Sequence, residues 1–254
     1  MSQTILITRP EGQGADMMAQ LEAAGWQCVH KPLLRIAPFT EEHGAPFYSM
    51  KQHIMDLDHY DVVISVSGNA SSLAVDMIDQ YWPQMPVGID WYAVGPSSAK
   101  AFQPLGIDMQ VPTHNHSEGL LELQGLQNLQ DKKVLILRGV GGREHLAQSL
   151  TARGAHVAYC ELYQRQAVRF AQGELSALLT QQQIHYALLT SGEMLQQLAN
   201  ELDDAIKQDL HVIVPSQRIA NMAPELNITH IHVCEQINGQ ELLDCLNKIN
   251  NHLV

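Results

Sequence analysis

The sequence predicts an α/β protein made of two similar, doubly wound domains with parallel sheets. Apolar runs of strand length alternate with segments of helical spacing along the 254 residues, which is the pattern of parallel sheets covered by helices. The chain also repeats itself. Residues 5–9 (ILITR) match residues 134–138 (VLILR), and Gly25 matches Gly154, both 129 residues later (138 − 9 and 154 − 25). A strand ending in Ser67-Gly68 recurs 124 residues later (191 − 67) as one ending in Ser191-Gly192.

The first unit, residues 1–36, has the pattern of a strand, a helix and a strand. Pro10 suits a helix start, and Met17 and Leu21 lie on one apolar helical face. An extended link follows, because Pro38 disfavours a helical conformation in the residue before it. The expected elements are a strand at 4–8, a helix ending near 24, a strand at 27–34, the link at 35–40 and a helix at 45–57.

The remaining units continue the alternation. In the central part of the chain, Gly154 stands where a left-handed helix cap belongs, between a helix and the next strand. The expected strands are 61–66, 91–94, 109–112, 134–137, 155–162, 186–190, 211–214 and 228–234. Helices are expected after Ser67, Gly95, His116, Glu144 and Ser191, and over 239–250.

The four units are A (residues 1–36), B (from residue 61), A′ (residues 134–165) and B′ (from about residue 185). They can be combined in two ways: A with B and A′ with B′, or B with A′ and B′ with A. The gap between B and A′ is short, which favours placing those two in one sheet. We therefore expect a continuous central domain, residues 37–172, and a discontinuous domain of residues 1–36 and 173–254. Linkers are expected at 35–40 and 164–172.

Composition excludes several classes of function. With 15 basic and 27 acidic residues the net charge is −12, and without a dense Lys/Arg cluster the chain is a poor nucleic-acid binder. No apolar run has the roughly 18 residues of a membrane span, and no leader peptide is evident, so we expect a cytoplasmic protein. The four cysteines contain no CxxC pair and suit reduced core positions.

Familiar motifs are missing. Residues 139–144 (GVGGRE) have Glu144 where GxGxxG needs its third glycine, and neither a phosphate loop nor an acyl-transfer triad can be assembled. The alternating pairs His114/His116 and His230/His232 permit metal binding, but loop or strand-end histidines explain them better, so we expect no metal.

Small polar residues and arginines recur where strands end. Each is open to the simpler interpretation of a helix N-cap or a structural salt bridge. Together, at equivalent sheet edges of two domains, they suit a large anionic ligand bound by amides, hydroxyls and arginines. The set comprises Arg9, Ser67, Gly95, Ser97, Ser98, Arg138, Gly139, Arg143, Ser191, Ser216 and Gln217.

The chain resembles the uroporphyrinogen-III synthase family along almost its whole length. The resemblance is carried by the order and spacing of ILITRP, VSGNA, AVGPSSAKAF, LRGVGGREHLAQSLTARGAHV, ELYQRQ, LLTSGE and VPSQRIA. It implies two α/β domains joined by a two-stranded linker, and a cofactor-free, monomeric enzyme. The implied reaction converts the linear tetrapyrrole hydroxymethylbilane into uroporphyrinogen III, with loss of water and inversion of the last ring.

The resemblance also assigns roles. The family's functional tyrosine falls on Tyr163, a phenol that would help the substrate hydroxyl to leave as water; the alternative is an aromatic residue that packs the linker. The strand-end serines would bind substrate carboxylates, with Arg9, Arg138 and Arg143 as ionic partners. Gln217 stands where relatives often carry a hydroxyl residue, which puts its side-chain contact in doubt.

Two other functions remain open from the residues alone. One is a non-catalytic ligand-binding or regulatory module with the same fold. The other is a sugar or nucleotide transferase, for which the chain lacks a phosphate loop and an acidic metal-binding pair.

Overall fold

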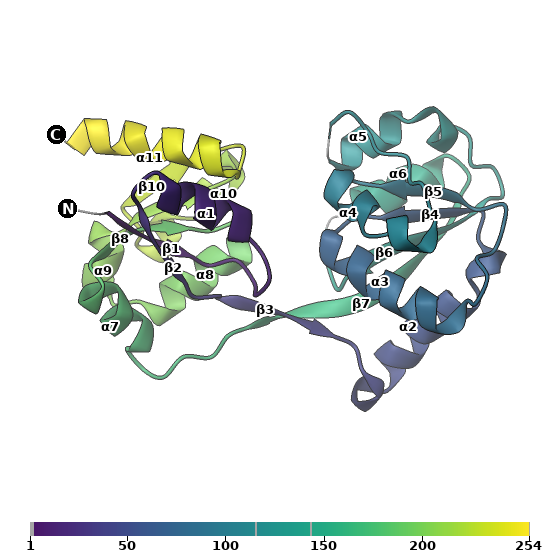
Figure 1. Cartoon of the computed structure of the whole chain (residues 1–254), viewed down its shortest axis with the longest axis horizontal. Helices are drawn as coiled ribbons and strands as arrows, with labels where there is room; N and C mark the ends of the chain where they lie inside the picture. Colours follow the sequence, from purple (N-terminus) through teal and green to yellow (C-terminus); the bar gives the residue numbers. More distant parts are fainter. Residues whose placement is uncertain (1–2, 115, 143, 254) are drawn as a thin grey trace. The chain divides into compact units, whose positions relative to one another are not determined.

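The computed structural model describes residues 3–114, 116–142 and 144–253. The chain divides into two compact units: a terminal unit, Met1–Arg35 with Gln166–Val254, and a central unit, Ile36–Arg165. The terminal unit is therefore discontinuous in sequence and the central unit continuous. Each is an α/β unit with one five-stranded sheet between helices (Figure 1).

The sheet of the central unit has the strand order β3-β7-β6-β4-β5. Strand β4 pairs in parallel with β5 on one side and with β6 on the other, and β6 pairs in parallel with β7. From β4 the chain adds β5 on one side of the sheet and then β6 on the other, so the strand order reverses between β4 and β6. Such a switch point opens a crevice at the carboxyl ends of the strands. The strands are β3 Leu34–Pro38, β4 Val62–Ser65, β5 Asp90–Ala93, β6 Lys133–Gly139 and β7 His156–Ala167.

Helices cover both faces of this sheet. Ile54 and Ile78 are fully buried in a core against α2, α3 and α4, whereas Leu120 and Leu150 belong to a separate core under α5 and α6. The helices are α2 Ala45–Met55, α3 Gly68–Tyr81, α4 Pro96–Lys100, α5 Ser117–Glu122 and α6 His145–Ala152. Short 3₁₀ turns lie at Glu41–His43, Leu57–His59, Gln103–Leu105 and Gln124–Leu126.

The terminal unit repeats this plan, with strand order β10-β9-β8-β1-β2 and parallel pairing throughout. Its switch point lies between β1 and β8, the counterparts of β6 and β4. The strands are β1 Thr4–Ile7, β2 Gln27–His30, β8 Ile184–Leu188, β9 His211–Val214 and β10 His230–Val233.

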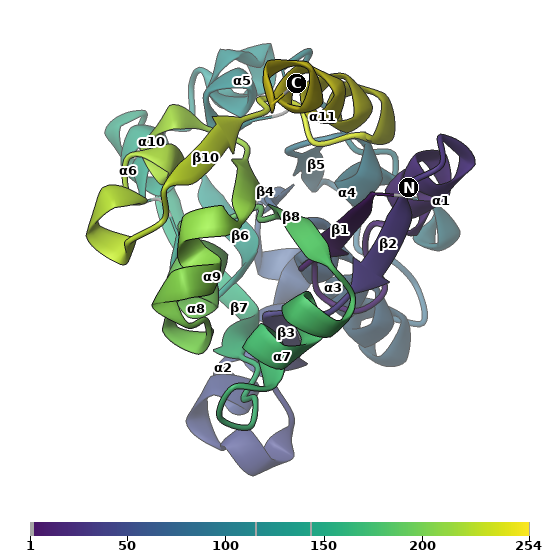
Figure 2. The same ribbon diagram turned by 90° about the vertical axis from the view of Figure 1, so that its left-hand side faces the viewer.

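Helices also lie on both sides of the sheet of the terminal unit. Figure 2 shows α1 and α11 on one side and α7 and α8 on the other, and two separate apolar cores fill these layers. The helices are α1 Ala15–Ala23, α7 Glu174–Gln181, α8 Gly192–Glu201, α9 Asp204–Asp209, α10 Gln217–Ala220 and α11 Gly239–Leu253, with a 3₁₀ turn at Pro224–Leu226.

Strands β3 and β7 carry the chain across the unit boundary. The backbone N–H of Phe39 donates to the carbonyl of Leu162 (3.0 Å), and that of Val168 donates to the carbonyl of Leu33 (2.9 Å). Since the partner numbers rise on one strand as they fall on the other, the two segments run antiparallel. The fold is therefore two doubly wound domains joined by a two-stranded linker.

Three details differ from the sequence-based expectation. The prediction of a third strand at 109–112 was wrong, because a single β-bridge between Gln110 and Tyr92 takes its place. The first helix begins at Ala15 rather than near Pro10, because Gly12 and Gly14 adopt positive φ angles of 76° and 87° and continue the turn. The strand expected at 27–34 ends at His30, and Leu34 already belongs to β3.

Three histidines form a stack on one face of β9 and β10. The ring of His211 lies 4.6 Å from that of His230 and 5.2 Å from that of His232, with interplanar angles of 9° and 11°. A hydrogen bond of 3.0 Å joins His211 Nδ1 and His232 Nε2. Burial, with the neighbouring His211 and His230, lowers the pKa of His232 from 6.5 to about 4. The stack therefore favours the neutral form of the His232 imidazole.

We expect the terminal unit to lose stability as the pH falls from 6.5 towards 4. In that range the unfolded chain binds a proton at His232 that the folded chain does not, so acid favours unfolding. His232→Gln should flatten the pH dependence of the thermal midpoint, measured by circular dichroism. His59→Gln, at an exposed histidine of the central unit, is the control; equal pH profiles for His232→Gln and the parent would contradict the expectation.

Candidate functional site

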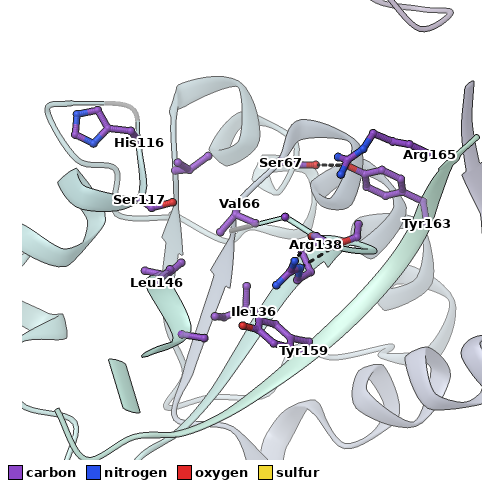
Figure 3. A pocket seen from close by; sticks show the side chains of 15 residues that line it. Val66, Ser67, His116, Ser117, Ile136, Arg138, Leu146, Tyr159, Tyr163 and Arg165 are labelled. Atoms are coloured by element: carbon purple, nitrogen blue, oxygen red, sulfur yellow. Dashed lines mark hydrogen bonds between the residues drawn. The ribbon is translucent and has the colours of Figure 1, made fainter. Parts of the chain in front are cut away.

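A cavity of about 380 Å³ lies at the carboxyl edge of the central sheet, at its switch point (Figure 3). Side chains that follow or end β4, β6 and β7 form its walls, together with the start of α5 and α6. The walls include Ser67, Arg138, Gly139, Tyr159, Tyr163 and Arg165. Three of the expected site residues of this unit, besides Tyr163, thus meet here: Ser67, Arg138 and Gly139.

Ser67 is fixed by the helix that it begins. Its Oγ accepts a hydrogen bond from the backbone N–H of Ala70 (3.1 Å), as the N-cap of α3. The same Oγ lies 3.1 Å from the phenolic oxygen of Tyr163. The positive end of the α3 dipole therefore acts on the tyrosine through one hydroxyl group. The Oγ of Ser67 therefore both caps α3 and contacts the Tyr163 hydroxyl in the cavity.

Tyr163 owes its direction to a β-bulge. Along β7, Arg138 pairs with Glu161, but the next residue, Gly139, pairs with Tyr163, so Leu162 is an extra residue in the strand. A bulge of this kind exchanges the faces of the residues that follow it. Tyr163 consequently joins Leu162 in the core beside α2 and α3, whereas regular alternation would place it on the opposite face.

Gly139 makes room for the tyrosine ring. A Cβ atom at this glycine would lie 2.5 Å from Cζ and 2.6 Å from Cε2 of Tyr163. The ring is 3% exposed and is held by the surrounding core, so it has little freedom to move aside. The glycine is required by this close contact.

Arg138 already has acceptors for its guanidinium. Its Nε donates to the carbonyl of Gly139 (3.1 Å), Nη1 to Glu144 Oε1 (3.1 Å), and Nη2 to the carbonyl of Gly141. The guanidinium carbon also lies 4.4 Å from the ring centre of Tyr159. Arg138 thus holds the glycine-rich turn against the sheet, and a substrate carboxylate would have to compete with Glu144.

Tyr159 and Glu144 complete this network. The phenol of Tyr159 donates a hydrogen bond to Glu144 Oε2. Burial, assisted by Glu144, raises the pKa of Tyr159 to about 12, while the bonds from Tyr159 and Arg138 lower the pKa of Glu144. The pair is therefore a protonated phenol and a carboxylate at neutral pH. Sequence reasoning missed Tyr159, although it precedes Tyr163 by four residues on the same strand.

In the terminal unit, Arg9 follows β1 at the equivalent switch point. Its Nε is buried and has no hydrogen-bond partner among the described residues, and burial lowers its pKa. The repeat explains the contrast with Arg138. Subtracting 129 from Glu144 and Tyr159 leads to Ala15 and His30, which supply neither a carboxylate nor a phenol. An unpaired guanidinium nitrogen at a strand end suits an anionic ligand.

The other expected site residues of the terminal unit lie at helix starts. Ser191 accepts a bond from the N–H of Met194 (3.2 Å) as the cap of α8. Ser216 begins α10 without a side-chain capping bond. Gln217, the first residue of that helix, donates to the side chain of Asn221 at its C-cap (2.9 Å).

The remaining expected residues belong to the central unit. Gly95 begins α4, Ser98 is buried and Ser97 is exposed. Of this segment the cavity walls include Val94 but none of these three residues. Arg143, the third expected arginine, lies outside the described residues.

Two negative findings concern the described residues only. They contain no group of three or more His, Cys, Asp or Glu side chains placed to hold a metal ion. Within the same ranges, no helix has the length and hydropathy needed to cross a bilayer.

Comparisons with known proteins agree with this architecture. A family model described as "Uroporphyrinogen-III synthase HemD" matches residues 15–244. The uroporphyrinogen-III synthase of Escherichia coli K12 is 33% identical over 252 residues, which cover 96% of this chain and 99% of that protein. The protein of the same name from Proteus mirabilis is 36% identical, covering 77% of this chain and 96% of its own length.

A solved structure shares the fold. The uroporphyrinogen-III synthetase of Helicobacter pylori 26695 superposes with a TM-score of 0.61 at 15% identity, covering 98% of this chain and all of that one (100%). The family model matches almost the whole chain, and the Escherichia coli relative covers 96% of it. This chain belongs to the uroporphyrinogen-III synthase family.

Proposed function

We propose that this chain converts hydroxymethylbilane into uroporphyrinogen III, closing the linear tetrapyrrole with inversion of ring D and loss of water. The observation that carries the proposal is the phenol of Tyr163, fixed by Ser67 and Gly139 in a cavity at the switch point of the central sheet. The enzyme so proposed is monomeric and cytoplasmic, and it needs no cofactor and no nucleic-acid partner.

Tyr163 acts first, as a general acid. The phenolic proton passes to the hydroxyl group of the substrate, the C–O bond breaks, and water leaves. The electron pair of the adjacent pyrrole nitrogen stabilises the carbon as the C–O bond breaks, which gives an azafulvenium cation beside the Tyr163 phenolate. A hydrogen bond from Ser67 to the phenolic oxygen would stabilise the charge that develops there, because the Ser67 Oγ is itself bonded to an N–H at the start of α3.

Ring inversion depends on position more than on acid strength. The substituted position of ring D, a nucleophilic carbon, must attack the electron-poor azafulvenium carbon and form a spiro-pyrrolenine, which then rearranges with loss of a proton. The open chain can also close without an enzyme to the isomer that is not inverted. The protein therefore has to hold the two reacting ends in one orientation, which is proximity catalysis.

Substrate binding requires partners for acetate and propionate groups against a net charge of −12. We propose Arg9 as one such partner, since its Nε lacks an acceptor among the described residues. Backbone amides and hydroxyls would bind further carboxylates. The proposed hydroxyl and amide positions are Ser67, Gly95, Ser97, Ser98, Gly139, Ser191, Ser216 and Gln217, and the further arginine is Arg143. Arg138 already bonds Glu144 and the turn carbonyls, so we assign it to holding the turn rather than to binding a carboxylate.

The alternative function, a module that binds tetrapyrroles without turnover, has no specific support in the site. The group needed for the acid step, the hydroxyl of Tyr163, lies at the cavity and is bonded to Ser67.

The first prediction concerns the product. Freshly prepared hydroxymethylbilane, incubated with the protein and oxidised, should give mainly the isomer III porphyrin by chromatography. The substrate without protein is the control and should give isomer I. Isomer I alone at the control rate would exclude the proposed reaction, and tight binding without turnover would favour the alternative.

Tyr163→Phe should lower kcat about 100-fold, because the variant keeps the ring but loses the acid. Stability should fall by only about 1 kcal/mol, the usual contribution of one hydrogen bond. Tyr60→Phe is a matched control: that phenol bonds His53 (2.7 Å) in the same unit, outside the cavity walls. If Tyr163→Phe turns over like the Tyr60 variant, Tyr163 is not the proton donor.

Arg9 and Arg138 should respond differently to substitution by Gln. Arg9→Gln should raise KM about tenfold with an unchanged thermal midpoint, because it removes a ligand contact and no bond from its Nε. Arg138→Gln should lower stability by about 2 kcal/mol, because the carbonyls of Gly139 and Gly141 lose their donor. Equal midpoints for the two variants would contradict this division of roles.

A further inference from the structure

Two of the four cysteines lie next to each other in the terminal unit. Cys234 directly follows β10, and Cys245 lies in the middle of α11. The Cys234 Sγ lies 3.7 Å from the carbonyl oxygen of Glu241, and in a helix this oxygen accepts the N–H of the residue four positions later, which is Cys245. A hydrogen bond joins the two thiols. The fold thus brings into contact two thiols that are 11 positions apart in sequence (245 − 234).

The other two cysteines lie elsewhere. Cys28 is on β2, which forms the opposite edge of the same sheet from β10. Cys160 is on β7 and is fully buried in a core of the central unit. All four are free thiols. Among the described residues, Cys234 and Cys245 are therefore the one pair of neighbouring thiols.

The two thiols differ in access to solvent. Cys245 is half-buried and lines a cavity of about 640 Å³, together with Lys248 and Ile249. Cys234 is only 6% exposed, and the described walls of the cavity do not include it. A small reagent that enters the cavity therefore meets the Cys245 thiol first.

The surroundings also make Cys245 the better nucleophile. Burial, followed by the neighbouring Cys245 and Glu241, raises the pKa of Cys234 to about 11. Burial raises the pKa of Cys245 too, but there the hydrogen bond with Cys234 and the charge of Lys248 oppose the shift. The thiolate is the form that attacks a disulfide. Cys245 is thus suited to the first attack and Cys234 to the second.

We propose that Cys234 and Cys245 form a reversible dithiol, which closes to a disulfide by exchange with a small disulfide such as glutathione disulfide. First, the Cys245 thiolate attacks one sulfur of the reagent, forms a mixed disulfide and releases one glutathione. Cys234 then loses its proton to solvent and attacks the Cys245 sulfur, which releases the second glutathione. The protein loses two hydrogen atoms, and one glutathione disulfide is reduced to two thiols.

The new bond would tie the end of the edge strand β10 to α11. Leu242 and Leu246 of this helix are fully buried in the core that also contains Cys234. A cross-link between two segments already packed together mainly restricts the unfolded chain, and it therefore stabilises the folded unit. This modification is separate from the proposed reaction, so its test does not depend on isomer III formation.

The test incubates the parent protein, Cys245→Ser, Cys234→Ser and Cys28→Ser with glutathione disulfide at mildly alkaline pH without air. Iodoacetamide in denaturant then blocks the remaining thiols, and tryptic peptides are analysed by mass spectrometry. Residues 219–247 contain no Lys or Arg, so both cysteines of the pair fall in one peptide, residues 219–248. Cys28→Ser is the matched control, because it removes a half-buried thiol of the same unit.

A second digestion locates the bond. A Glu-specific protease cuts after Glu235 and Glu241, which lie between the two cysteines. The fragments with Cys234 and Cys245 then stay together only if a disulfide joins them, and dithiothreitol should separate them.

We expect the peptide 219–248 of the parent and of Cys28→Ser to lose two hydrogen atoms and to escape alkylation. Cys234→Ser should stop at the mixed disulfide, with one glutathione on Cys245. Cys245→Ser should react at Cys234 at least about tenfold more slowly, because that thiol is buried. Oxidation should raise the thermal midpoint of the parent by about 5 °C, and dithiothreitol should reverse the rise.

A parent peptide that keeps both thiols, or that carries glutathione on each cysteine without a bond between them, would overturn the inference. An oxidised parent with a lower thermal midpoint would also contradict it, because the bond would then distort the packing of α11. The result for the parent needs no variant, so a variant that fails to fold leaves the test intact.

Discussion

The packing of the Tyr163 ring on Gly139 determines the geometry of the central site. Because the ring occupies the space of a Cβ atom, strand β6 must end in glycine, and the phenol is brought to Ser67. Ser67 in turn is held by the first turn of α3. Two strands and one helix therefore locate a single hydroxyl group, and the cavity of about 380 Å³ forms around it.

The two units show how one repeated position acquires different chemistry. Arg9 and Arg138 follow equivalent strands at equivalent switch points, yet only Arg138 has Glu144, Tyr159 and the turn carbonyls as partners. The substitutions that separate them, Ala15 and His30, lie outside the strand-end motif itself. The repeated strand-end motif thus gives both arginines the same place in the fold. The side chains around each arginine determine whether its guanidinium is bonded within the protein or can bind a ligand.

Much of the fold could be predicted because it follows from apolar runs and their repeat. The strand ends at Ser67 and Gly139 were identified from local pattern alone. The bulge at Leu162 could not be, since an extra residue in a strand leaves no mark in apolar alternation and is defined only by its partner. The role of Arg138 likewise depends on contacts with Tyr159 that spacing does not reveal.

The bulge makes the register of β7 against β6 decide which way the Tyr163 side chain points. Side-chain direction in a strand alternates with each residue, and the extra residue Leu162 places Tyr163, rather than Leu162, opposite Gly139. If Leu162 paired with Gly139 in a regular strand, the sheet would keep its strand order while the Tyr163 ring turned to the opposite face. The surroundings of this phenol therefore depend on a backbone irregularity as much as on the residue itself.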